Sequence, residues 1–152
     1  MKYIGKDLYR LIPQRNPVVM IDEFEQVGAN AARTVLNCRS DNLFILNDGT
    51  MAETGLIEHI AQSCSALAGF QALCQASQAT AGDEAPAAEA APPIGLIGEV
   101  KHFVCHRRPR FGERVDTRVS FDLTFGQTTL ATGKSYVGKA LIAETKLKIF
   151  MQ

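Results

Sequence analysis

The sequence predicts an α+β domain in which an antiparallel sheet of about six strands curls around one long central helix. Two observations lead to this prediction. The stretch 50–76 is apolar on nearly every side at helical spacing, so other structure is expected to surround it. Most of the remaining chain consists of short runs of strand formers separated by turn residues. A sheet wrapped around a single buried helix satisfies both observations.

The chain before the helix is predicted to form a helical turn and a strand hairpin. Pro13 closes the turn, and together with Pro17 it keeps the backbone that follows extended. Two runs of strand formers then flank a turn that contains Gly28. In chain order, the predicted elements are a helical turn at 6–11, strands at 18–24 and 31–38, and a loop at 40–49.

The central helix is expected to begin with a capping box, in which the side chains of Thr50 and Glu53 bond to free backbone N–H groups of the first turn. A seam of small and polar residues runs along this helix. At roughly 100° per residue, the seam spans about 80° of the circumference. Its members are Gly55, Glu58, Gln62, Ser65 and Gly69.

Glu58 is the first indication of chemistry. A carboxylate in an apolar surround costs several kcal/mol unless it is paired or protonated, so its presence there suggests a task. The alternative is a solvated Glu58 near the helix N-terminus, where the macrodipole favours a negative charge. The helix alone leaves the two interpretations open.

The composition changes abruptly at 77–93, where alanine, proline and small polar residues dominate. We expect a flexible surface insertion within a single domain of residues 1–152, with a lid over the site as the alternative.

The last third of the chain shows strand signal throughout. Gly126-Gln127 and Gly138-Lys139 are two-residue loops of the kind that join antiparallel strands. The predicted strands are 94–104, 113–125, 128–137 and 140–151.

Charge and composition exclude several classes of protein. The 16 basic and 16 acidic residues balance, which argues against a nucleic-acid binder. The first residues contain no apolar signal region, and no apolar run approaches the ~20 residues that span a bilayer, so we expect a cytoplasmic protein without a membrane contact. The four cysteines lack C-x-x-C spacing, which favours reduced core thiols over a metal site, and no cofactor is expected.

Motifs in the first half of the chain resemble a known family. Residues 12–17, I-P-Q-R-N-P, are similar to an L-P-H-R-x-P pattern, with Gln14 in place of its histidine. Residues 58–62, E-H-I-A-Q, are similar to E-A-x-A-Q in a central helix, and Gly55 precedes them. Both patterns belong to the 3-hydroxyacyl-acyl carrier protein dehydratases of fatty acid synthesis, which have the hotdog fold.

The second half continues the resemblance and contains the main departure from it. Residues 138–144 are similar to the last hairpin of the family, and 106–115 stand where the family has a basic segment with a proline and a glycine turn. Dehydratases of this family carry a catalytic histidine in a G-H-F-P loop, which works with the helix glutamate of the dimer partner. The corresponding loop here, 44–49, contains no histidine, and Asn47 or Asp48 would occupy the vacant position.

Dehydration of a 3-hydroxyacyl thioester needs a base for the α-proton, an acid for the hydroxyl and donors for the thioester oxygen. The catalytic candidates are Glu58, Asp48 and Gln62, and the substrate-binding candidates are Gly55, Asn47 and Ser65. Glu58 would transfer one proton, Asp48 would replace the lost histidine, and Gln62 would orient Glu58 or a water. His59 has suitable chemistry but lies roughly 100° around the helix from Glu58, so a contact with the sheet or a dimer neighbour is the favoured interpretation.

A basic cluster occupies the end of the strand at 94–104 and the turn after it. It suits an acidic acyl carrier protein, or the phosphates of a pantetheine or CoA thioester, with an ordinary charged loop as the alternative. The candidate contact residues are Lys101, Arg107, Arg108 and Arg110, with His102 and His106 among them.

Three functions remain open from the sequence. The first is an acyl-thioester hydro-lyase of fatty acid or related lipid or polyketide metabolism, with Glu58 as its central residue. The second is a hotdog thioesterase, which can use a helix carboxylate without a histidine. The third is a non-catalytic subunit that binds an acyl chain or completes a heterodimer. The resemblance implies a homodimer, or a higher oligomer of dimers, because such domains form their acyl tunnel between two subunits.

Overall fold

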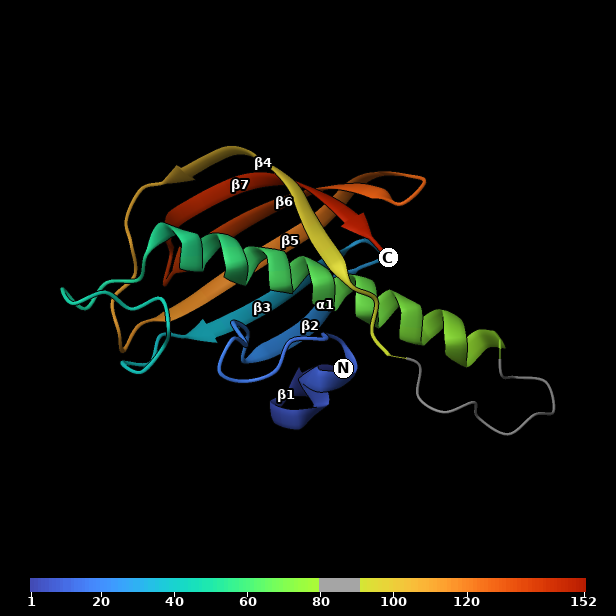
Figure 1. The fold of residues 1–152 in the computed structure, drawn as a ribbon, viewed down its shortest axis with the longest axis horizontal. Helices are drawn as coiled ribbons and strands as arrows, with labels where there is room; N and C mark the ends of the chain where they lie inside the picture. Colours follow the sequence, from blue (N-terminus) through green and yellow to red (C-terminus); the bar gives the residue numbers. More distant parts are fainter. Residues whose placement is uncertain (80–90) are drawn as a thin grey trace.

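Seven strands form one antiparallel sheet that curls around a single long helix (Figure 1). This is a computed structural model, and it describes residues 1–79 and 91–152. Its elements are β1 (Lys2–Ile4), the 3-10 helix η1 (Gly5–Arg10), β2 (Glu23–Gly28), β3 (Ala31–Asn37), α1 (Glu53–Ala79), β4 (Gly95–Cys105), β5 (Arg114–Phe125), β6 (Thr128–Val137) and β7 (Ala140–Met151). The strand order is β1-β2-β3-β5-β6-β7-β4, so β1 and β4 form the two edges. The predicted hotdog architecture is confirmed, with one more strand than expected because β1 has only three residues.

The last four strands lie within one residue of their predicted bounds, and the first hairpin strand does not. It begins at Glu23, whereas strand propensity predicted a start at residue 18. The reason is that residues 18–20 bond to side chains of the helix instead of to a neighbouring strand. The Val18 carbonyl accepts from Gln62, and the Met20 carbonyl bonds to His59.

Both ends of α1 also differ from the prediction. The capping box does not form, because the Thr50 hydroxyl and N–H both donate to the Asp48 carboxylate, at 2.6 and 2.9 Å. The helix therefore begins at Glu53 and continues to Ala79, so 77–79 are helical and not part of a surface insertion. Most of the predicted insertion, 80–90, lies outside the described residues, and 91–94 have no regular secondary structure.

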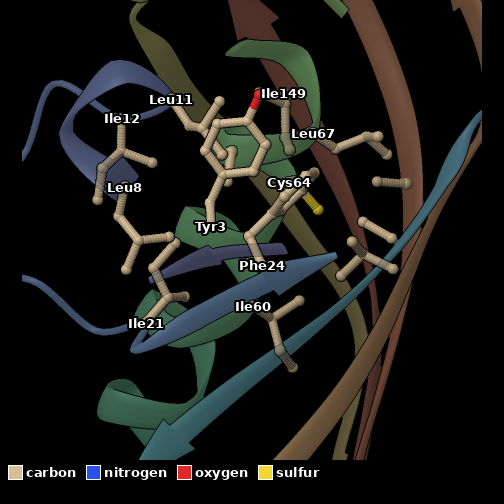
Figure 2. Packing of buried hydrophobic residues seen from close by; sticks show 14 of the residues in the cluster. Tyr3, Leu8, Leu11, Ile12, Ile21, Phe24, Ile60, Cys64, Leu67 and Ile149 are labelled. Atoms are coloured by element: carbon tan, nitrogen blue, oxygen red, sulfur yellow. The ribbon is translucent and has the colours of Figure 1, made fainter. Parts of the chain in front are cut away.

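The larger apolar core lies between the middle of α1 and the concave face of the sheet (Figure 2). Ile60, Cys64 and Leu67 of the helix pack there with Phe24 of β2 and Ile149 of β7. The core position predicted for Cys64 is confirmed, and burial raises the pKa of its thiol to about 12. A smaller core around Leu56 and Met51 lies beneath the first turns of α1.

A row of buried hydroxyls lies between the two cores. Thr34, Thr117 and Ser135 pair directly across β3, β5 and β6, so their side chains share the face that meets α1. Two polar residues of the helix form hydrogen bonds with this row. His59 Nε2 lies 2.8 Å from Thr117 Oγ1, and Ser63 Oγ lies 2.7 Å from Thr34 Oγ1. The polar row therefore fixes the helix at one position along the sheet.

His59 is fully buried in this row as a neutral ring. Its Nδ1 lies 2.6 Å from the Met20 carbonyl, which can only accept, so Nδ1 carries the proton and Nε2 accepts from Thr117. Burial lowers the pKa of His59 to about 4, although Asp22 and Asp116 act in the opposite direction. The imidazole thus stays uncharged at neutral pH.

This neutral histidine predicts an acid-sensitive fold. Because the folded pKa of about 4 lies below the ordinary value of 6.5, the unfolded chain binds more protons in this pH window. The free energy of unfolding should fall by up to about 3 kcal/mol as the pH drops through it. Urea titrations from pH 7.5 to 4.5 measure this loss, which His59→Asn should largely remove. The control His106→Gln, at an exposed histidine, should retain the slope, and equal slopes in all three proteins would contradict the prediction.

Candidate active site

Glu58 and Gln62 form the centre of the candidate site. Both project from α1 one turn apart, and Gln62 Nε2 donates to Glu58 Oε1 at 2.8 Å. Glu58 is partly buried, which lies between the two interpretations of the sequence. Within residues 1–79 and 91–152, no other group hydrogen bonds to its carboxylate and no cation pairs with it. The second carboxylate oxygen is therefore left for a ligand, a water or a partner chain.

Gln62 is buried, with 1% of its surface exposed, and all of its amide groups are used. Besides Glu58, Nε2 donates to the Val18 carbonyl at 2.7 Å, and Oε1 accepts from the Met20 N–H at 2.6 Å. The carbonyl and the N–H fix which end of the amide is oxygen and which is nitrogen. The predicted orienting contact between Gln62 and Glu58 is thus present, and it also ties the carboxylate to the segment 18–20.

The seam of small residues is covered by other parts of the same chain. A Cβ at Gly69 would lie 2.0 Å from the Leu11 carbonyl oxygen, and one at Gly55 would lie 2.5 Å from Cβ of Phe44. These two glycines therefore admit the N-terminal segment and the 44–49 loop against the helix. The Gly55 N–H, predicted to bind a thioester oxygen, donates to the Ala52 carbonyl at 2.9 Å.

Ser65 lies in the same seam and is 4% exposed. Its hydroxyl has no hydrogen-bond partner in the part of the chain that the structure describes, and the same holds for Oε1 of Gln14. A predicted substrate-binding residue is thus enclosed, and its polar atom is unsatisfied in the single chain.

The 44–49 loop carries the two other sequence candidates, and both are exposed. Asp48 Oδ1 accepts from Thr50, and Oδ2 lies 3.3 Å from Arg108. The Thr50 hydrogen bonds lower the pKa of Asp48, and the nearby Arg108 and Arg110 contribute in the same direction. No hydrogen bond joins either Asn47 or Asp48 to Glu58 among the described residues.

The structure brings two arginines of the basic cluster, Arg108 and Arg110, together with this loop. Arg110 Nη2 lies 3.4 Å from the Asp48 carbonyl, and Arg108 pairs with the Asp48 side chain. Arg107 points elsewhere, because both of its terminal nitrogens donate to the Glu113 carboxylate, at 2.8 and 3.1 Å. Lys101 lies on β4 and pairs with Glu99 at 3.8 Å.

Sequence reasoning placed His59 against the sheet, as its bond to Thr117 of β5 confirms, but it missed the segment 18–20 and the link from His59 to it. Strand propensity assigned 18–20 to a hairpin, and the contact of His59 with Met20 was not anticipated. One signal was available: His59 occupies the alanine position of the E-A-x-A-Q pattern, and a change from alanine to histidine inside a buried motif requires new polar partners.

The arrangement provides one carboxylate, that of Glu58, with a fixed orientation. It offers no cluster of three or more His, Cys, Asp or Glu side chains that could hold a metal ion within 1–79 and 91–152. Over the same residues, α1 is long but no helix is apolar enough to cross a membrane.

Similar folds occur in several solved structures. The Dehydratase Heterocomplex ApeI:P from Xenorhabdus doucetiae contains a chain with a TM-score of 0.77 and 16% identity, covering 95% of this chain and 90% of that one. Protein PA5202 from Pseudomonas aeruginosa gives 0.66 and 13%, covering 94% and 97%. The PaaI protein of E. coli, from the phenylacetic acid degradation operon, gives 0.61 and 8%, covering 84% and 80%. At these identities the likeness establishes the hotdog fold alone.

The family follows from the sequence comparison. A search of curated proteins found no match. A protein-family model described as "ApeP-like: ApeP dehydratase" matches residues 6–152, which is nearly the whole chain. The relationship to dehydratases that the motifs predicted is confirmed at this level. The chain belongs to the ApeP-like family of dehydratases.

Proposed function

We propose that this chain is a dehydratase subunit that acts on 3-hydroxyacyl thioesters, with Glu58 as a proton-transfer group. In the reaction the α-carbon loses a proton, the β-carbon loses its hydroxyl, and water and a 2,3-unsaturated thioester are formed. The observation that supports this role is the Glu58–Gln62 pair, because it holds a carboxylate with one free oxygen at a fixed place on the central helix.

The local environment suits such a role. Gln62 is held by two backbone groups, so its second amide hydrogen is directed at Glu58 and at no competing acceptor. A pre-oriented carboxylate avoids part of the reorganisation that proton transfer otherwise requires. The absence of a cation beside Glu58, within the described residues, leaves the carboxylate free to accept and return a proton.

The reaction also needs a second proton-transfer group opposite Glu58. Asp48 is the candidate within the chain, but a carboxylate whose pKa is lowered by Thr50 and two arginines is a poor base, and it holds no proton to donate near neutral pH. We therefore propose that the group opposite Glu58 comes from a second hotdog chain. That chain is either a copy, which would contribute Asp48, or a homologous subunit with its own acid or base.

The edge strand β4 is the surface we propose for this second chain. It ends the sheet (Figure 1). Four apolar side chains are exposed along it: Leu96, Ile97, Val100 and Val104. If two copies of β4 paired antiparallel about Val100, each Glu99 would face a Lys101 of the other copy. This charge match favours a second copy as the occupant. The apolar side chains would be covered at the same time.

Replacing Glu58 with glutamine tests the activity. The purified protein, alone and mixed with a homologous hotdog subunit, is incubated with 3-hydroxyacyl and saturated acyl thioesters on pantetheine, CoA and carrier protein. Mass spectrometry should detect loss of water, and Glu58→Gln should lower that rate by about 100-fold or more, because the amide cannot exchange a proton.

The matched control is Glu53→Gln, which neutralises an exposed carboxylate of the same helix and should retain the rate. An additional variant, Asp48→Asn, separates the two sources of the second group, since it should lower the rate only if a copy contributes Asp48. Release of free thiol from the saturated thioester would identify a thioesterase instead. Full activity in Glu58→Gln would refute the assignment of Glu58.

Val100→Glu tests the assembly, since it places a charge at the centre of the proposed strand pair. The wild-type chain should sediment as a dimer and the variant as a monomer. Val27→Glu, at a comparably exposed valine of β2, should remain a dimer. A dimeric Val100→Glu would rule out this interface. A heterodimer would be identified if the wild-type chain alone stays monomeric and forms a dimer through β4 only when a homologous subunit is added.

We also propose that Arg108 and Arg110 contact the acidic carrier protein or the phosphate of its thioester arm. Reversing both charges, in Arg108→Glu/Arg110→Glu, should weaken carrier-protein binding by about tenfold at low salt, and less at high salt because the attraction is screened. Fluorescence anisotropy with a labelled carrier protein measures the change. Lys6→Glu/Arg10→Glu is the matched double reversal on η1 and should bind normally. Unchanged affinity in the Arg108/Arg110 variant would remove the proposed contact.

A further inference from the structure

The buried hydroxyl row is connected to the candidate active site through Met20. His59 Nδ1 donates to the Met20 carbonyl at 2.6 Å, and the Met20 N–H donates to Gln62 Oε1 at 2.6 Å. Gln62 then donates to Glu58 Oε1 at 2.8 Å. Both polar backbone groups of Met20 are thus held by side chains of α1, and one of those side chains contacts Glu58.

The direction of every hydrogen in this chain of bonds follows from its neighbours. Since Nδ1 of His59 donates a hydrogen bond to the Met20 carbonyl, Nε2 carries no proton and must accept a hydrogen bond from Thr117. The one hydroxyl hydrogen of Thr117 is used in that bond, so Ser135, 2.7 Å away, must donate to Thr117. The donors therefore run from the sheet to Met20 in one direction, which strengthens each bond by polarising the next.

A second branch of the same row does not reach the site. Ser63 donates to the His59 carbonyl at 2.7 Å, so Thr34 must donate to Ser63. This branch secures the helix to β3 and has no contact with Met20 or Gln62. It offers an internal comparison, because its bonds are as deeply buried as those of the first branch.

We propose that His59 is a positioning residue for Glu58, acting through Met20 and Gln62. The imidazole, held by Thr117, fixes the Met20 carbonyl; Met20 then places its N–H on Gln62, which presents its free amide hydrogen to Glu58. This inference rests on the proposed function of Glu58. It assigns His59 no contact with substrate.

The irregular backbone at 18–20 explains why such a device is needed. These residues precede β2 and have no strand partner to set their positions. Gln62 alone would hold the Met20 backbone through its N–H and leave the buried Met20 carbonyl without a hydrogen bond. His59 supplies the second point of attachment.

Two substitutions of the same residue separate the two ring nitrogens. The amide of asparagine reaches the place of Nδ1, whereas the longer glutamine reaches the place of Nε2. His59→Asn should keep the bond to Met20 and retain kcat within about threefold. His59→Gln should keep the bond to Thr117, lose Met20, and lower kcat by about 10- to 100-fold with little change in KM, as expected for a misplaced catalytic group.

Thr34→Val is the matched control, because it removes a buried hydroxyl from the branch that does not reach Met20. It should lower the urea midpoint and leave kcat unchanged. Thr117→Val removes the donor to Nε2 and leaves the bond from Nδ1 to Met20, as His59→Asn does, so it should also retain kcat within about threefold. His59→Leu cannot donate to Met20, so it should lower kcat as His59→Gln does, and it tests the inference even if His59→Gln does not fold. Equal kcat values in wild type, His59→Gln and His59→Leu would overturn it.

A measurement without substrate distinguishes this inference from the proposed function. Hydrogen exchange of the Gln62 side-chain amide, followed by NMR, should be slow in wild type, His59→Asn and Thr34→Val, and fast in His59→Gln. If no thioester is turned over by the wild type, the proposed function fails while this pattern still supports the positioning of Gln62 by His59. Unchanged protection in His59→Gln would overturn the positioning itself.

Discussion

One buried amide, that of Gln62, joins the helix, the irregular segment before β2 and the candidate catalytic carboxylate. Its carbonyl and one of its hydrogens are used by the backbone of 18–20, and the other hydrogen holds Glu58. Loss of any one of these three contacts would leave a buried polar group without a partner, which costs about 1–3 kcal/mol of folding stability. The same side chain therefore serves folding and the orientation of the site.

The elements predicted correctly are those whose signal is local. The Gly-X loops at Gly126 and Gly138 both have positive φ, and the strands that they join begin and end where the sequence indicated. The long apolar stretch correctly predicted a helix surrounded by a sheet. Local patterns succeed here because turn chemistry and strand periodicity act over a few residues.

The errors arise where distant residues overrule local preference. Val18 to Ile21 has strand propensity, yet its backbone bonds to a helix some forty residues away. Thr50 and Glu53 fit a capping box, but Asp48 takes the Thr50 hydroxyl. The candidate site shows the same division. The contact between Gln62 and Glu58 was predictable from their spacing of four residues. The ion pair of Asp48 with Arg108 was not, because Arg108 lies in a loop sixty residues further along the chain.

The hydroxyl row that divides the apolar interior has a consequence for how the domain can open. The smaller core, around Leu56 and Met51, lies on one side of the row, and the larger core around Phe24 and Leu67 lies on the other. Water that enters the smaller core meets a band of polar groups before it reaches the larger one. Opening of the helix end that carries Glu58 would therefore wet the hydroxyl row, whose groups can bond to water, before it exposed the packing of Phe24 and Leu67.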